Sequence, residues 1–155
     1  MKKSTMIVTL MLIASAAAAQ KVNYTGEWKL NEEKSTLGRE YSMAPAFISV
    51  SHARKTLDLK TTNVWNGQEV VIESHFTLNG KETQNMGFGE TPTTSTAEVN
   101  KKTRTLIVVT RGSSEGIGDW TSTQILSMQD GQLVIDFTAA SDMGKITESY
   151  VFDRQ

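Results

Sequence analysis

Apolar and polar residues alternate along most of this chain, and short groups of turn-forming residues interrupt the alternation. Over 133–139 and again over 146–152, large or apolar side chains recur at every second position. Successive side chains of a β-strand point to opposite faces, so a period of two indicates strands with one buried face. Helical spacing is almost absent. The pattern therefore predicts an antiparallel all-β domain.

Turn signals divide the chain into about ten expected strands. Their ranges are 22–30, 46–52, 56–62, 69–78, 82–87, 93–99, 104–111, 119–128, 132–140 and 145–152. Asn66-Gly67, Asn79-Gly80 and Asp130-Gly131 favour type I′ turns, because both residues of each pair tolerate a positive φ. The long gap after the first strand contains Asn31, a candidate N-cap, and Gly38, a candidate stop, so we expect a short helical turn there.

The expected connections are mostly short and join strands that follow one another in sequence. Such hairpins favour an up-and-down meander, and closing the meander into a β-barrel removes its two exposed edges. A sandwich of two sheets is the alternative architecture.

The first nineteen residues are typical of a secretory signal peptide. Lys2 and Lys3 form a positive start, 6–13 form an apolar run, and small Ala residues precede Gln20. We expect cleavage between Ala19 and Gln20 and a periplasmic or secreted location. The apolar run is too short to span a bilayer comfortably, and no later segment is a better candidate, so no integral membrane span is expected.

The remaining chain, 20–155, has the size of one domain. Because the leader holds two of the 16 basic residues and none of the 17 acidic ones, the mature net charge is about −3. This mild acidity argues against nucleic acid as a partner. The chain has no Cys, which excludes disulfides, thiolate catalysis and a lipid anchor on cysteine. The sequence indicates no oligomeric state.

The segment 24–30, Tyr-Thr-Gly-Glu-Trp-Lys-Leu, resembles the Gly-x-Trp opening of the calycins, the lipocalins and the fatty-acid-binding proteins. The resemblance implies a lipocalin-like barrel of ten strands that holds a ligand inside, similar to the lipocalin-like domains that bacteria export. It also implies a barrel floor in which Gly26 lets the first strand bend and Trp28 closes the end. Arg154 is placed to stack on the indole of Trp28, a structural contact.

The last strand departs from the family pattern. Fatty-acid-binding proteins commonly carry Arg-x-Tyr there, and the matching positions are Glu148-Ser149-Tyr150. A carboxylate in place of the Arg would repel an anionic head group. Glu148 shares a strand face with Tyr150, so it points either into the barrel, where it needs partners, or outward into solvent.

We take five residues as candidates for ligand binding because they fall on expected inner faces: Glu148, Tyr150, Trp120, Phe137 and Phe76. Hydroxyl and amide groups around 91–96 and 121–124, and apolar positions such as Ile135, are further candidates for a cavity wall.

Signals for catalysis and cofactors are weak. Gly112–Gly116 matches the letters of a Gly-x-Ser-x-Gly nucleophile elbow, but another strand follows it where the elbow requires a helix, so a hairpin is expected. His52 and His75 belong to no local metal-ligand cluster, and His75 should face outward. We assign no catalytic residue, no metal and no cofactor.

The sequence predicts an exported binding protein that holds a small apolar or amphipathic ligand inside a barrel. The alternative is a non-enzymatic adaptor with a filled barrel, whose loops bind a protein or glycan. An enzyme using Glu148 and Tyr150 as acid and base is the third and least supported hypothesis.

Overall fold

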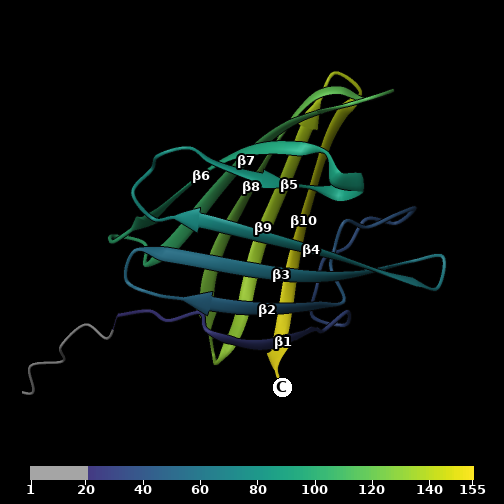
Figure 1. Cartoon of the computed structure of the whole chain (residues 1–155). Helices are drawn as coiled ribbons and strands as arrows, with labels where there is room; N and C mark the ends of the chain where they lie inside the picture. The colour runs from purple at the N-terminus through teal and green to yellow at the C-terminus, as the bar shows by residue number, and fades with distance from the viewer. Residues whose placement is uncertain (1–20) are drawn as a thin grey trace, which may run out of the picture.

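The computed structural model describes residues 21–155, so the predicted signal peptide and its cleavage site lie outside the described residues. Ten strands and one short 3-10 helix follow one another in the order of Figure 1. The elements are β1 (Gly26–Leu30), β2 (Phe47–His52), β3 (Thr56–Trp65), β4 (Gln68–Thr77), β5 (Thr83–Met86), η1 (Phe88–Glu90), β6 (Pro92–Asn100), β7 (Thr105–Ser114), β8 (Gly118–Gln129), β9 (Gln132–Ser141) and β10 (Gly144–Arg154). Each expected strand is present.

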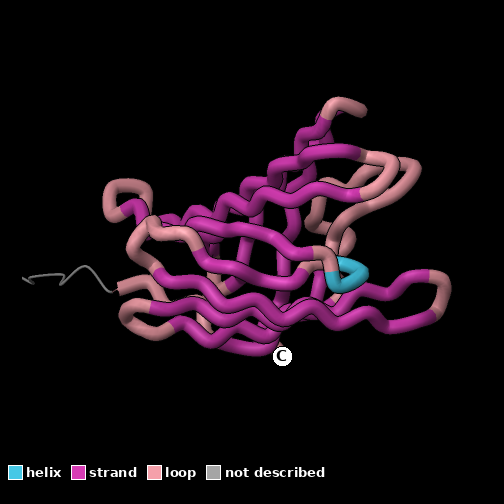
Figure 2. The backbone as a smooth tube through the Cα atoms, turned by 45° about the horizontal axis from the view of Figure 1, so that its top comes forward, coloured by secondary structure: helices cyan, strands magenta, loops and turns pink. Residues whose placement is uncertain are grey.

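The strands form one antiparallel sheet in the order β4-β3-β2-β1-β10-β9-β8-β7-β6-β5. This order is a meander whose first strand pairs with its last, and the sheet curves into a nearly closed barrel (Figures 1 and 2). The predicted barrel is confirmed. The sandwich alternative is wrong, because all ten strands belong to one continuous sheet.

The barrel has a gap where its two edges, β4 and β5, meet without a ladder of backbone hydrogen bonds. Asn85 bridges this gap. Its Oδ1 accepts a hydrogen bond from the His75 backbone N–H at 2.8 Å, and its Nδ2 donates one to the His75 carbonyl at 2.9 Å. One side-chain amide thus takes the place of a paired strand residue.

Turn chemistry follows the sequence at two of three positions. Asn66 and Gly67 have φ of 50° and 76°, and Asp130 and Gly131 have φ of 50° and 78°, as type I′ turns require. The same prediction for Asn79-Gly80 is wrong, because only the glycine has a positive φ, at 73°. This connection joins the two unpaired edge strands, so no two-residue hairpin forms.

Residues 31–46 form an irregular segment between β1 and β2, which we call the strap. It begins with a single turn: Asn31 Oδ1 accepts a hydrogen bond from Lys34 N–H at 3.1 Å, and Ser35 N–H donates to the Glu32 carbonyl at 3.3 Å. Asn31 therefore caps the expected turn. The strap then runs beside β10, where Thr36 and Ser149 exchange backbone hydrogen bonds. The one 3-10 helix, η1, lies elsewhere, and no helix within 21–155 could cross a membrane.

The barrel has a closed end and an open end. The closed end carries the turn after β2 and the residues before β1, and the open end carries the strap and the turns after β3, β7 and β9. Side chains at most 2% exposed fill the closed end: Tyr24, Trp28, Leu57, Leu106, Leu126, Leu133 and Phe152. The Tyr24 hydroxyl donates to the Leu126 carbonyl at 3.0 Å, so the segment before β1 seals this end.

Candidate ligand site

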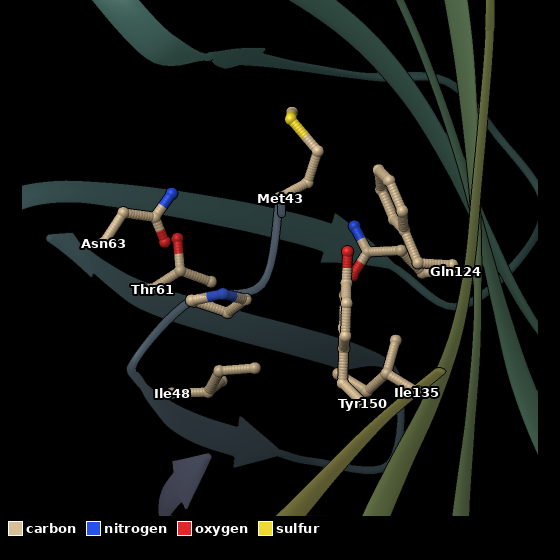
Figure 3. A pocket seen from close by; sticks show the side chains of 9 residues that line it. Met43, Ile48, Thr61, Asn63, Gln124, Ile135 and Tyr150 are labelled. Carbon is tan, nitrogen blue, oxygen red and sulfur yellow. The ribbon is translucent and has the colours of Figure 1, made fainter. Parts of the chain in front are cut away.

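A cavity of about 120 Å³ lies inside the barrel, between the strap and the walls (Figure 3). The residues that line it are Met43 and Pro45 of the strap, Ile48 of β2, Thr61 and Asn63 of β3, Gln124 of β8, Ile135 and Phe137 of β9, and Tyr150 of β10. Period-two alternation places the wall residues inside, because they share strand faces with the closed-end core.

One part of the cavity wall is apolar. Ile135 is the register partner of Tyr150 across β9 and β10, and Phe137 lies two residues further along β9. The rings of Phe137 and Tyr150 are stacked, with centroids 5.6 Å apart and planes inclined by 26°. Together with Ile48, these side chains form a surface suited to a flat apolar group.

The remaining wall carries polar groups that have few partners. Asn63 Oδ1 is buried and makes no hydrogen bond to any described residue. Gln124 lies on the opposite wall, and its side-chain amide also makes no hydrogen bond to a described residue. Figure 3 shows the two carboxamides pointing toward each other across the cavity. Thr61 contributes a hydroxyl whose hydrogen bond to the Ile72 carbonyl is long, at 3.5 Å.

Glu148 lies next to this cavity with only 2% of its surface exposed. Its Oε1 accepts a hydrogen bond from Gly38 N–H at 2.6 Å. Its Oε2 accepts hydrogen bonds from Met43 N–H at 2.9 Å and from the Tyr150 hydroxyl at 2.6 Å. The carboxylate therefore binds the strap to β10 and is fully partnered within the chain.

The electrostatics of this pair follow from the same contacts. Burial raises the pKa of Glu148, but the hydrogen bonds from Tyr150, Gly38 and Met43 lower it by more than burial raises it. The pKa therefore lies below its ordinary value. Burial and the neighbouring carboxylate raise the pKa of Tyr150 far above its ordinary value. Tyr150 therefore stays protonated and donates to an ionised Glu148.

Glycine is required at position 38 by a close approach of the backbone. A Cβ on Gly38 would lie 2.2 Å from the Tyr41 carbonyl oxygen and 3.3 Å from Glu148 Oε1. The strap thus makes a tight loop around the carboxylate, and only a residue without a side chain fits there.

The structure brings together some of the predicted site residues. Phe137 and Tyr150 line the cavity, and Glu148 contacts the strap beside it. Trp120 lies over Gly112, where a Cβ would be 2.4 Å from the Trp120 ring, and it donates to Ser114 Oγ at 3.1 Å. Neither Trp120 nor Phe76, which is buried in the core, lines the cavity.

Sequence reasoning missed Asn63 and the strap residue Met43. The expected third strand ended at residue 62, whereas β3 continues to Trp65. The inward alternation of Leu57 and Leu59 extends through Thr61 to Asn63, and this extension was the available signal. Nothing in the sequence indicated that Met43 covers the cavity, because the strap has no regular period.

The barrel floor has the geometry that the Gly-x-Trp segment implies. The Arg154 guanidinium lies 4.3 Å from the Trp28 ring centroid, and its Nη1 donates to the Thr25 carbonyl at 3.1 Å. A Cβ on Gly26 would lie 2.5 Å from Arg154 Nη1, so glycine leaves room for the guanidinium. The Trp28 indole donates to the Tyr24 carbonyl at 3.0 Å. These residues seal the end opposite the cavity.

The weak catalytic motifs lie apart from the cavity. Gly112 and Ser114 lie on β7, which leads through a turn into β8, so the segment forms a hairpin. His75 faces outward, as expected, and its Nδ1 lies 2.6 Å from Asp58 Oδ1 on the exposed surface. Within 21–155, no three His, Cys, Asp or Glu side chains are grouped to hold a metal ion.

Comparisons with known proteins give matches in structure. No known family model matches the sequence, and no curated protein sequence matches it significantly. The zebrafish ileal bile acid-binding protein, solved with cholic acid, has a TM-score of 0.61 and 12% identity over 85% of this chain and 98% of its own. The apo lipid-binding protein 8 of Caenorhabditis elegans has a TM-score of 0.60 and 12% identity, and the match covers 85% of this chain and 95% of that protein. The chain therefore has the calycin-like barrel fold.

Proposed function

We propose that this chain is an exported binding protein that holds a small apolar or amphipathic molecule inside its barrel. The observation that carries the proposal is the cavity beneath the strap, which combines an apolar wall with unpartnered amides. Ligand sites are typically concave and mostly apolar, with a few convergent polar groups. The predicted signal peptide supports export.

The cavity limits the size of the ligand. Its volume is about 120 Å³, and an apolar protein cavity of about 150 Å³ holds a benzene molecule. A single ring is therefore about the largest rigid group that this space could hold without movement of its walls. A long acyl chain or a sterol would require the strap or the gap between β4 and β5 to open.

Structural neighbours support the proposal only at the level of the fold. The zebrafish protein was solved in complex with cholic acid, so a protein of similar fold binds an amphipathic molecule. Fold similarity does not transfer a ligand, because function depends on the residues of the site.

The ligand is best sought on the native protein. The mature protein, purified from the organism that exports it, should be measured by native mass spectrometry, and released molecules should be identified after organic extraction. We expect a stoichiometric small molecule. The mass of the chain also tests the predicted N-terminus at Gln20.

A matched pair of variants tests where binding occurs. Thr61 lines the cavity and Thr62, its neighbour on β3, points to the other face of the sheet. We expect the wild type and Thr62→Phe to bind one toluene molecule with similar affinity, measured by NMR titration. Thr61→Phe places a ring in the cavity. We expect it to weaken toluene binding at least tenfold, because toluene then loses its apolar contacts with the cavity wall.

One observation favours the adaptor alternative. Trp65 and Phe88 are each 61% exposed at the open end, and their ring centroids lie 6.4 Å apart. Exposed aromatic clusters are common in protein-binding surfaces. A native protein without a bound molecule that also fails to bind toluene would contradict the carrier proposal and favour the adaptor.

A further inference from the structure

We propose that the cavity selects an uncharged ligand with a single hydroxyl-like group and discriminates against carboxylates. This inference rests on the proposed binding function and specifies its ligand class. It comes from the juxtaposition of Asn63 and Gln124 on opposite walls of a cavity that contains no cationic side chain.

The two carboxamides define the polar part of the ligand. Asn63 Oδ1 is a buried acceptor without a partner, and a buried polar group that stays unsatisfied destabilises the protein. Gln124 offers donors and an acceptor from the opposite wall. A hydroxyl group both donates and accepts, so one hydroxyl between the walls can satisfy both amides.

The charges around the cavity exclude an anionic group. No Lys, Arg or His lines the cavity. Glu148, whose partners Met43 and Tyr150 line the cavity, already accepts hydrogen bonds from Gly38, Met43 and Tyr150 and needs nothing from a ligand. A bound carboxylate would therefore lose its hydration, find no cation and meet the negative charge of Glu148.

A cationic group is disfavoured for a different reason. The charge of Glu148 attracts a ligand ammonium, but its oxygens are engaged by the strap N–H groups and the Tyr150 hydroxyl, so no direct ion pair offsets the lost hydration of the ammonium. The groups open to the cavity are neutral amides and a hydroxyl. Neutral groups repay the desolvation of a neutral hydroxyl better than that of an ion.

Four molecules of similar size test this selectivity on the mature wild-type protein at neutral pH: toluene, benzyl alcohol, benzoate and benzylammonium. Each has one ring, which suits the cavity. We expect benzyl alcohol to bind about tenfold more tightly than toluene, as one net hydrogen bond would give. We expect benzoate and benzylammonium to bind more weakly than toluene, by calorimetry or NMR titration.

Two variants link the selectivity to the carboxamides. Asn63→Leu and Gln124→Leu should each remove most of the preference for benzyl alcohol while leaving toluene affinity unchanged or improved. The two substitutions are on different strands, so they test the site independently if one of them disturbs folding. Circular dichroism and the melting temperature report on folding, and Thr62→Phe serves as the control outside the cavity.

The outcomes separate this inference from the proposed function. If toluene binds and Thr61→Phe abolishes that binding, the binding function is supported. If in the same experiment benzyl alcohol binds no more tightly than toluene, or either ion binds most tightly, the proposed ligand class is overturned. Failure of all four molecules to bind, with no ligand on the native protein, would overturn both.

Discussion

At the scale of single residues, Glu148 shows how its neighbours determine the role of a carboxylate. Its place on the last strand, beside Tyr150, suggested a ligand contact. The structure instead gives each of its oxygens a partner within the chain, two from the strap and one from Tyr150. Glu148 is therefore a structural clamp that holds the strap to β10.

This clamp predicts a pH-dependent stability. Hydrogen bonds hold the folded pKa of Glu148 below its ordinary value of 4.5, so its contribution is complete above that value and is lost as the pH falls through the lower folded pKa. We expect Glu148→Gln to lower the free energy of unfolding by about 2 kcal/mol at neutral pH, since hydrogen bonds to a charged group are lost. Urea denaturation measures this loss.

Urea denaturation at acid pH tests whether the charge of Glu148 causes this loss of stability. The difference between wild type and Glu148→Gln should shrink as the pH falls, because both side chains are then neutral. Glu98→Gln, at an exposed position on β6, is the control and should change stability little. An equal difference at all pH values would mean that shape rather than charge is responsible.

At the scale of elements, backbone hydrogen bonds hold the paired strands together, whereas single side chains hold the strap and the junction of the two edge strands. Nine strand pairs use backbone ladders that alternation and turn residues predict. The junction of β4 with β5 instead depends on the side chain of Asn85, and the strap depends on Glu148. Because few hydrogen bonds hold these two places, we expect them to open before the paired strands do, and the proposed ligand would enter there.

The gap between β4 and β5 can be tested with one substitution. Asn85→Ala removes both hydrogen bonds to the His75 backbone, so we expect the His75 amide to exchange with solvent faster and stability to fall by about 1 kcal/mol. Hydrogen exchange followed by NMR measures both effects. Gln84→Ala, on the same strand but bonded to Thr94, should leave His75 unchanged. Unchanged protection of His75 in Asn85→Ala would show that the edges stay together without the bridge.

At the scale of the whole molecule, the barrel divides into a closed end filled by buried side chains and an open end that holds a cavity. The closed end holds the largest fully buried side chains, with Tyr24 and Trp28 sealing it. The open end holds the cavity, the strap and several exposed apolar side chains: Tyr41, Met43, Trp65, Phe88, Ile117 and Met143. Under the proposed binding function, the closed end would keep the fold while the open end admits the ligand.

The division predicts uneven protection from hydrogen exchange. Amides in the paired central strands β8 and β9 should exchange only on global unfolding, whereas those of 31–46 should exchange through local opening. Mass spectrometry of peptides from the two regions measures this contrast. In Glu148→Gln the strap should lose protection while β8 and β9 keep theirs. A strap as protected as β8 would contradict local opening of residues 31–46.

The sequence by itself determined the strands, most of their turns and the sealed floor, because these follow from local alternation, from φ preferences and from the Gly26-x-Trp28 segment. Only the tertiary structure decided the site. Glu148 contacts Gly38 across 110 residues of sequence, and Asn63 and Gln124 face each other from opposite walls of the cavity. Whether a buried polar group is partnered depends on such distant neighbours, which no local pattern encodes. For this reason the fold could be read along the chain, whereas the candidate site could be read only in part: strand alternation placed Phe137 and Tyr150 in the cavity wall, but the partners of the polar groups came from the tertiary structure.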